Sequence, residues 1–556
     1  MTGQSMITAE SIGAAARFDP QLRIPRRPRV RRGLVISTEP DQVVVTGTPK
    51  KQMFRGRSAA DLLPALLTLL DGARTHAEIA AALERPEESV FKAVSLLWAS
   101  GVIEEGPPRT GGTDRPATST AATDGRLADF LSRVGSATEA NASWEQAAAR
   151  LRGARVEVFG DPDLAALLRE ELAGSVAVSV AAPAVPHDNT LPSQDTTLVV
   201  WAEHDGATDD RGRTRLADHC WDKGVPLLRL RVHGRGAALG PLVDPRTTPC
   251  LECLSVQDPA DDDRPQRPAD RRLAAALLAH DLFAAVSRTT PSPLPLRWRV
   301  VDLETLAHKD TSSPTRPGCP RCCATPGPLT ERAALATRFE ASVAMPPKEF
   351  ADLKAHQMHY KPSNLALQRV SRTWPVAPAV QLPSPGYDRL AHEEDDTPLD
   401  AHALSLLLAV TAGIKTDGEE RVSRWTASGG NIGSVIAYAV IRDVAGLAPG
   451  VYGYVPTEHR LARLASATTG IGGAAPATLV LTGDFPKVAR KYSAFALRIV
   501  LLDGGCAQAT ARAAARTLGI GLTPRPRWDD DAVASALGIS PDVEPVTAVI
   551  DLGGDK

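Results

Sequence analysis

The sequence predicts a multidomain protein that combines α+β and α/β units. Its 556 residues are too many for one hydrophobic core and correspond to roughly three to four domains. Between residues 156 and 232, apolar runs typical of strands alternate with helical patterns, which predicts a parallel sheet covered by helices. Two Cys-x-x-Cys pairs close this region and predict a metal site.

Composition excludes several classes of function. Hydrophobic residues make up 43% and charged residues 23%, which is typical of a globular protein. The 63 Lys and Arg residues are balanced by 65 Asp and Glu residues, so we expect no nucleic-acid partner. No run approaches the roughly 18–20 apolar residues of a membrane span, and the N-terminus lacks the pattern of a secretory signal. We therefore expect a cytoplasmic protein without a membrane partner.

Residues 1–105 predict a small α+β domain of winged-helix shape. A basic run, Arg23 to Arg32, precedes the first strand. Thr75 and Glu78 form a capping-box pattern at the start of one helix. The expected elements are strands at 34–37 and 43–46, helices starting at Ser58, at Thr75 and after Pro86, and a further strand from Val102.

Residues 106–125 are rich in Pro, Gly, Ser and Thr and predict a linker to an α/β domain at 126–327. The expected elements of that domain are helices at 126–152, 163–174 and 213–224 and strands at 156–160, 196–202 and 225–232. The first strand is followed by one glycine, Gly160, and then by Asp161 and Asp163. Phosphate binding needs close backbone approach and no repelling carboxylates, so we expect this domain to act as a scaffold that does not use ATP.

Four cysteines have the spacing of a structural zinc site. Cys250 and Cys253 form one pair and Cys319 and Cys322 the other, and two such pairs complete a tetrahedral S₄ site. Four protein ligands leave no position for water, so the metal is expected to be structural. Two alternatives stay open: four unrelated buried thiols, or Cys323 in the place of Cys322.

The remaining cysteines and a histidine pair favour ordinary structural roles. Cys220 and Cys506 are expected to be small buried residues. His356 and His359 resemble a metal-ligand pair, but a surface pair is the preferred interpretation.

Residues 328–556 predict a third domain. Its apolar runs and helical periodicities place the expected elements as helices at 402–414 and 506–518 and strands at 435–441, 477–482, 497–503 and 545–551.

The run GVPLLRLRVHGRGAALGPLVDPRTTPCLECLSVQ, followed by GCPRCC, resembles the ThiF-like partner of azole-forming cyclodehydratases. The resemblance implies a Cys₄ zinc, a separate YcaO-type cyclodehydratase that carries out the ATP chemistry, and a ribosomal precursor peptide as substrate. The N-terminal domain similarly resembles a peptide-recognition element that binds a leader peptide as an added strand. An edge strand in VISTEP or QVVVTG and the basic run fit that role. A DNA-binding winged helix and a solvated basic arm are the alternatives.

The runs at 421–454 and 489–522 resemble nitroreductase-fold dehydrogenases that oxidise azolines to azoles with FMN. The whole chain thus resembles two subunits of a microcin-type azole synthetase fused together. FMN sites of this fold lie across a dimer interface, so the resemblance implies a homodimer. It also implies a catalytic pair and a flavin-contacting loop, with Lys491 and Tyr492 as the pair and Arg424, Ser428, Gly429, Gly430 and Asn431 in the loop.

One segment departs from this resemblance. Where the dehydrogenases carry an arginine cluster for the flavin phosphate, this chain has SPGYDRLAHEEDDTPLD, with Arg389 alone among acids. Arg525 and Arg527 are candidates to replace that cluster. The departure favours a second hypothesis, a flavin-free scaffold that presents the precursor peptide. A third hypothesis, which does not depend on the departure, is a winged-helix DNA-binding regulator that senses redox state through its cysteine pairs; the near-neutral net charge disfavours it.

Overall fold

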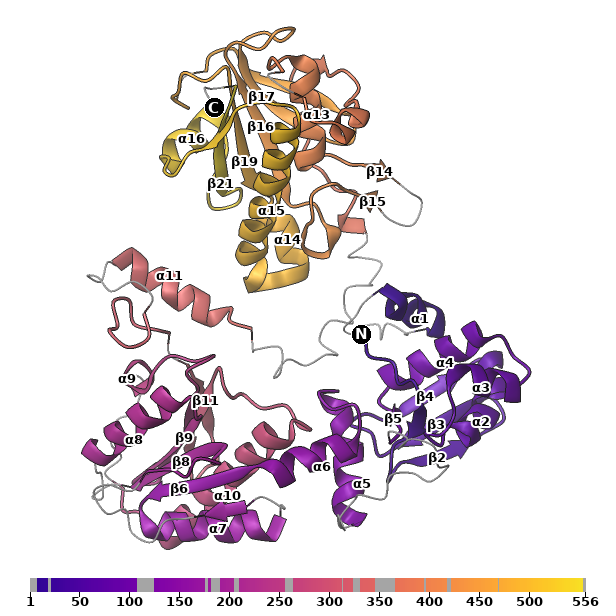
Figure 1. Ribbon diagram of the computed structural model, residues 1–556, viewed down its shortest axis with the longest axis vertical. Coiled ribbons are helices and arrows are strands. Elements are labelled where there is room, and N and C mark those ends of the chain that lie inside the picture. The colour runs from indigo at the N-terminus through magenta and orange to yellow at the C-terminus, as the bar shows by residue number, and fades with distance from the viewer. Residues whose placement is uncertain are drawn as a thin grey trace. The chain divides into compact units, whose positions relative to one another are not determined.

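The computed structural model describes most of the chain, and its contacts divide it into two compact units, Met1–Gln357 and Met358–Lys556 (Figure 1). The finer division predicted from the sequence, with boundaries at 105, 125 and 327, stays a prediction. In the described part of the chain, no helix is both long enough and apolar enough to cross a membrane. The described residues are 8–18, 22–107, 125–175, 179–181, 191–204, 210–255, 264–312, 314–323, 331–345, 366–394, 397–417, 422–468 and 470–553. The predicted histidine pair, His356 and His359, lies outside them, as does the predicted linker from 108 to 124.

A three-stranded antiparallel sheet in the order β2-β3-β4 forms the centre of the N-terminal part. Val43 and Val45 of the middle strand are fully buried under the helices. The predicted strands, helices and Thr75 capping box are confirmed. The elements are α1 Ala9–Phe18, β1 Pro28–Val30, β2 Val35–Thr38, β3 Gln42–Thr46, β4 Gln52–Arg55, α2 Arg57–Leu69, α3 His76–Ala82, α4 Glu87–Ala99 and β5 Ile103–Glu105, with β1 paired to β5.

Two arginines of the predicted basic run form ion pairs in a buried network. Glu104 of β5, with no side-chain exposure, accepts hydrogen bonds from Arg29 Nε at 3.1 Å and Arg31 NH1 at 3.2 Å. Arg31 NH2 also donates to Glu139 at 2.8 Å, and Arg29 NH1 to Glu145 at 2.8 Å. The expectation that the whole run offers charge to an acidic leader peptide is therefore wrong for Arg29 and Arg31, because these guanidinium groups hold β1 against the next helices.

The predicted helix at 126–152 is two helices, α5 Gly125–Val134 and α6 Trp144–Gly153. Between them, Glu139 adopts a left-handed backbone conformation with φ +52°, which a continuous helix does not allow. The break lets the carboxylate of Glu139 reach Arg31. Buried charges are normally paired, so this contact supplies a counter-charge that the helical pattern of the sequence does not reveal.

A seven-stranded sheet in the order β12-β11-β10-β9-β8-β6-β7 forms the middle of the first unit. The strands β7, β6, β8 and β9 are parallel, whereas β10, β11 and β12 are antiparallel. The predicted parallel sheet is thus correct for four strands only, since hairpins extend it at one edge. The elements are β6 Arg155–Gly160, α7 Pro162–Ser175, β7 Ser179–Ala181, β8 Leu198–His204, α8 Asp210–Lys223, β9 Leu227–His233, β10 Gly236–Val243, α9 Leu251–Leu254, α10 Pro268–Ser287, β11 Trp298–Asp302, β12 His308–Thr311 and α11 Glu331–Ser342.

The carboxyl end of β6 carries acidic groups, as the sequence indicated. Gly160 has φ +100°, and a β-carbon there would lie 2.0 Å from the carbonyl oxygen of Ala202. Asp161 follows at once, and its carboxylate pairs with His204 Nε2 at 3.1 Å. A carboxylate at this edge disfavours a phosphate, so the expectation that this domain does not use ATP stays a prediction with geometric support.

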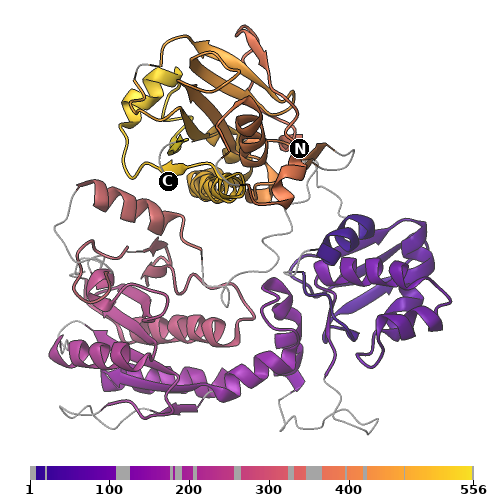
Figure 2. The same cartoon turned by 45° about the horizontal axis from the view of Figure 1, so that its top comes forward.

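The second unit is built on an antiparallel seven-stranded sheet in the order β13-β18-β17-β16-β19-β21-β20. Alternate residues of its central strands face two cores: α13 and α15 cover one face and α16 the other (Figures 1 and 2). The elements are β13 Ala379–Gln381, α13 Ala401–Ala412, β14 Thr416–Asp417, β15 Val422–Ser423, β16 Val435–Ile441, β17 Gly450–Val455, β18 Arg460–Ala465, β19 Ala477–Gly483, α14 Phe485–Tyr492, α15 Ala496–Thr517, β20 Leu522–Pro524, α16 Asp530–Leu537 and β21 Val546–Leu552.

The predicted strand at 497–503 is wrong, because these residues form the start of the long helix α15. Val500, Asp503 and Ala507 are buried at helical spacing, whereas Leu501 and Leu502 are 49% and 58% exposed. An apolar run of this length does not distinguish a strand from a buried helix. The same helix carries Cys506, which is exposed, so the expectation of a buried thiol is wrong there; Cys220 is buried as expected.

Candidate active site and metal centre

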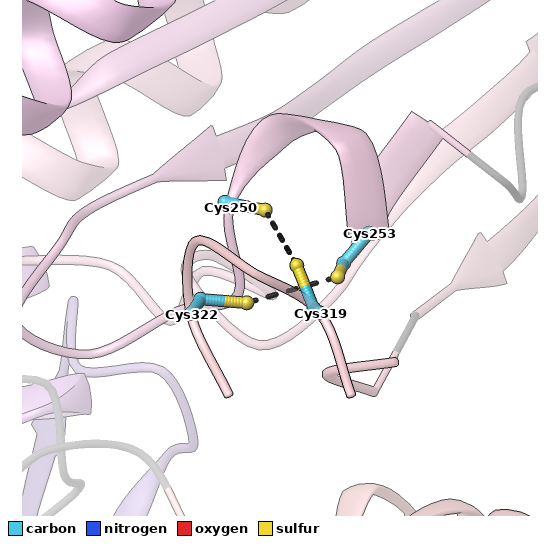
Figure 3. A group of neighbouring side chains, drawn as sticks. All are labelled: Cys250, Cys253, Cys319 and Cys322. Atoms are coloured by element: carbon cyan, nitrogen blue, oxygen red, sulfur yellow. Dashed lines mark hydrogen bonds between the residues drawn. The ribbon is translucent and has the colours of Figure 1, made fainter. Parts of the chain in front are cut away.

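The four predicted metal ligands lie together in the first unit (Figure 3). Cys250 is the N-cap of the short helix α9 after β10 and Cys253 lies within that helix, whereas Cys319 and Cys322 lie on a facing turn. All four sulfur atoms lie within 4.8 Å of one another, and the Cys250–Cys319 and Cys253–Cys322 separations are both 3.7 Å. A tetrahedral zinc with Zn–S bonds of about 2.3 Å requires sulfur atoms about 3.8 Å apart. The donor set therefore fits zinc.

Backbone groups around the cluster favour thiolates at some of its positions. The amide of Arg316 donates to Cys253 Sγ at 3.3 Å. Burial opposes ionisation of Cys319, but amides of Cys322 and Arg321 outweigh it and lower the pKa of the Cys319 thiol to about 6. Burial raises the pKa of Cys250. Of the two adjacent cysteines, Cys322 joins the group.

In the second unit, the predicted Ser-Gly-Gly segment forms a tight loop before β16. The amide of Asn431 donates to the carbonyl of Ser428 at 2.9 Å, and the amide of Gly433 donates to the Ser428 hydroxyl at 2.9 Å. Gly430 and Asn431 both have left-handed backbone angles, with φ +59° and +57°. This conformation favours glycine, so the sequence of the loop follows from its shape.

A buried carboxylate that was not predicted from the sequence, Asp503, accepts hydrogen bonds from this loop. Asp503 of α15, which is 3% exposed, accepts from the amide of Gly429 at 2.8 Å and from the hydroxyl of Ser434 at 2.5 Å. Burial raises its pKa, while these hydrogen bonds and Lys487 oppose that effect. The helical spacing of Val500, Asp503 and Ala507 was the available signal, but the strand interpretation of this segment concealed it.

The predicted catalytic pair faces the same loop. Lys491 and Tyr492 end α14, and a β-carbon added to Gly430 would lie 2.0 Å from Lys491 Nζ and 3.0 Å from the Tyr492 hydroxyl. Lys491 Nζ also lies 5.0 Å from the centre of the Tyr492 ring. Burial lowers the pKa of Lys491 and, together with the charge of Asp503, raises the pKa of Tyr492 to about 12. The structure thus brings an amine of reduced basicity and a protonated phenol against a glycine loop.

Arg424 contacts the backbone of the loop at Asn431 and Gly433. Its NH1 donates to the carbonyl of Asn431 at 3.2 Å and its NH2 to the carbonyl of Gln368 at 2.6 Å. The guanidinium packs directly on Gly433, where a β-carbon would meet Arg424 Nε at 2.4 Å. Arg424 therefore shapes the loop, whatever it contributes to a ligand.

Of the three arginines considered for a flavin phosphate, two are paired with carboxylates. Arg389 donates two hydrogen bonds to Glu394, at 2.9 and 2.6 Å. Arg525 donates two to Asp551, at 2.8 and 2.7 Å. Arg527 is exposed. Arg389 and Arg525 would therefore have to leave their partners to bind a phosphate.

The match to a family model falls in this second unit. Residues 395–554 match the sequence model of the nitroreductase family. A protein of Methanocaldococcus jannaschii named as a nitroreductase is 25% identical over 162 residues, which are 27% of this chain and 80% of that protein.

Solved structures resemble larger parts of the chain at low similarity. A heterocyclase in complex with substrate and cofactor is 19% identical, with a TM-score of 0.38, over 53% of this chain and 39% of that one. The heterocyclase TruD is 16% identical, with a TM-score of 0.38, over 80% of this chain and 63% of that one. This chain therefore spans less than two thirds of either heterocyclase. The family match places the Ser-Gly-Gly loop, α14 and α15 together in residues 395–554, which form a nitroreductase-family domain.

Proposed function

We propose that this protein oxidises thiazoline or oxazoline rings to thiazoles or oxazoles in a ribosomal precursor peptide, with FMN as cofactor. One observation carries the proposal: in a nitroreductase-family domain, Lys491 Nζ and the Tyr492 hydroxyl lie so close to Gly430 that an added β-carbon would be 2.0 and 3.0 Å from them. A separate YcaO-type cyclodehydratase would form the rings that this protein oxidises. The proposed oxidising unit is a homodimer, as the resemblance to azoline dehydrogenases implies.

Aromatisation of an azoline removes a proton from one ring carbon and a hydride from its neighbour. FMN supplies the hydride acceptor when bound. Lys491 accepts the proton at Nζ, because burial lowers its pKa and so increases the neutral fraction near pH 7. Tyr492 stays protonated at that pH and offers its hydroxyl as a hydrogen-bond donor. Ser428, Gly429, Gly430, Asn431 and Arg424 form the loop and its support.

The first unit contributes binding and structure in this proposal. Zinc on the four cysteines would hold α9 to the facing turn, and four protein ligands leave no catalytic position. A leader peptide would pair with an edge of the β2-β3-β4 sheet, where Val35 of β2 and Met53 of β4 are 63% and 46% exposed. The central strand β3 is paired on both sides, so the QVVVTG segment does not provide that edge.

A flavin-free scaffold is the second candidate function. The bidentate pairing of Arg389 with Glu394 and of Arg525 with Asp551 favours it, because a flavin phosphate would have to break these pairs to use those arginines. In this case the nitroreductase-family domain would present the precursor peptide to the cyclodehydratase.

The visible absorption spectrum of the purified protein distinguishes these two functions, with the released chromophore identified by mass. Bound FMN supports the enzyme, and a colourless protein that takes up no added FMN supports the scaffold. For the enzyme, Lys491→Ala should keep its flavin and lose azoline oxidation by about 10²–10⁴-fold. Arg490→Gln, which removes an exposed charge from the same helix, is the matched control. Full turnover of Lys491→Ala would refute the base assignment.

A further inference from the structure

A cavity in the second unit is lined by three cationic side chains, of which Arg372 and Lys487 have no part in the proposed chemistry. Ser371, Arg372, Arg424 and Lys487 contribute polar groups to its wall, together with Asp484. Three positive charges and one negative charge therefore surround the same space. Residues of β16 and β17 close the cavity on its apolar side.

Two of these cations, Arg424 and Lys487, contact the same residue, Gly433. Gly433 carries the Arg424 guanidinium against its α-carbon, and its carbonyl accepts from Lys487 Nζ at 2.9 Å. Lys487 Nζ also donates to the carbonyl of Val370 at 2.5 Å, so these two acceptors are neutral. Gly433 has φ +69° and no room for a side chain, which fixes the close approach of the arginine.

The charge of Lys487 is costly in this position. The side chain is 5% exposed, and burial together with repulsion from Arg424 lowers its pKa to about 8, although Asp484 and Asp503 oppose this effect. Buried charges are normally paired, because desolvation without a counter-charge is expensive. An anion in the cavity would add to the attraction of Asp484 and Asp503 and offset the repulsion from Arg424.

We propose that this cavity binds a phosphate monoester, namely the phosphate group of FMN, through Arg372, Arg424 and Lys487. The inference rests on the proposed function. It names residues for the flavin phosphate, for which the sequence shows no arginine cluster. Charge-assisted hydrogen bonds from guanidinium and ammonium groups are the usual means of holding a phosphate. Arg389 and Arg525 are paired with carboxylates, whereas the cationic lining of this cavity exceeds its acidic lining.

Paired titrations with FMN and riboflavin test this proposal, because the two ligands share the ring and differ in the phosphate. With binding followed by flavin fluorescence, we expect the protein to bind FMN at least about 100-fold more tightly than riboflavin, in line with hydrogen bonds to a charged group. Inorganic phosphate should compete with FMN and leave riboflavin binding unchanged. Equal affinities for FMN and riboflavin would overturn the proposal.

Arg372→Gln is the informative variant, since Arg372 is exposed and its loss should not affect folding. We expect it to weaken FMN binding by about tenfold and riboflavin binding hardly at all, the effect of one lost charged contact. Arg490→Gln, which removes an exposed charge outside the cavity, should change neither affinity. An equal loss in the two variants, or an equal loss for the two flavins in Arg372→Gln, would contradict the assignment.

A separate signal distinguishes failure of this inference from failure of the proposed function. The Arg372 guanidinium lies 5.8 Å from the centre of the Trp374 ring, so an anion bound at Arg372 should change the fluorescence of that tryptophan. One outcome is that neither flavin binds, but inorganic phosphate changes the protein fluorescence and the Trp374→Phe variant does not show this change. The anion site is then supported and the proposed flavin chemistry is refuted. If FMN and riboflavin bind alike and phosphate changes nothing, the anion site fails while flavin chemistry stands.

Discussion

Replacement of Gly430 by alanine separates the stability of the Ser-Gly-Gly loop from its chemistry. Gly430 has φ +59°, a conformation that costs an L-residue about 1–2 kcal/mol. The new β-carbon would lie 2.0 Å from Lys491 Nζ, which is the end of a flexible side chain, and 3.0 Å from the Tyr492 hydroxyl. Since Lys491 can rotate away at low cost, we expect the free energy of unfolding to fall by about 1–2 kcal/mol, the backbone cost alone.

The chemical effect of the same substitution should be much larger. A methyl group at Gly430 occupies the position of Lys491 Nζ, so the amine must leave the place from which it faces the substrate. A positioned general base contributes about 10²–10⁴-fold to a rate, so we expect azoline oxidation per bound flavin to fall by at least about 100-fold. The assay follows the loss of two hydrogens per ring by mass spectrometry, and urea denaturation reports stability.

Two glycines of the same unit provide matched controls. Gly538 has φ +67° with open space around its α-carbon, so Gly538→Ala carries the backbone cost without a contact. Gly472 has neither feature, so Gly472→Ala should change neither quantity. Gly430→Ala should match Gly538→Ala in stability and differ from it in rate. A rate within about threefold of the Gly538→Ala rate would refute the role of Lys491 as a base held against this loop.

Three further predictions concern metal, ion network and pH. Cys250→Ser should release zinc and lower the thermal stability of the protein. Cys506→Ser, which lies outside the cluster, should retain one zinc per chain by elemental analysis. A metal-free wild-type protein would disprove the site. Glu104→Gln should lower the free energy of unfolding by about 1.5–3 kcal/mol in urea, because Arg29 keeps Glu145 and Arg31 keeps Glu139 but both lose the charge of their shared carboxylate. A loss under about 0.5 kcal/mol would contradict this. Burial lowers the pKa of His459 in the folded protein, so the unfolded chain binds more protons at mildly acidic pH. The contribution of His459 to the free energy of unfolding should be constant above about pH 6.5 and be lost as the pH falls below it. A pH dependence unchanged in His459→Asn would exclude this histidine as the cause.

Local patterns in the sequence were sufficient for much of the fold and of the metal cluster. The Thr75 capping box depends on residues three positions apart, and each Cys-x-x-Cys pair depends on one turn, so short spacings report these features. The helix at the start of α15 was misread because Leu501 and Leu502 extend an apolar run beyond its buried positions. The spacing of Val500, Asp503 and Ala507, which are all buried in the structure, is the signal in this segment that favours a helix.

Pairing over long distances was not predictable in the same way. Arg29 and Arg31 looked like part of a solvated basic arm, but Glu104 and Glu139, more than seventy residues away, neutralise them. Charge runs in a sequence say nothing about which carboxylates the fold brings near. Lys487 was missed for the related reason that its two acceptors are backbone carbonyls, which no residue type signals.

The hydrogen bonds within the Ser-Gly-Gly loop decide what it can offer a flavin ring. The amide of Gly429 is committed to Asp503, and the amides of Asn431 and Gly433 are committed to Ser428. The loop therefore does not provide these three N–H groups to a ligand. The Ser428 hydroxyl accepts from Gly433 through oxygen and keeps its own hydrogen as a donor. A ring bound here would have to present an acceptor to Ser428, while Gly430, without a side chain, admits the ring and Lys491 to the same small space.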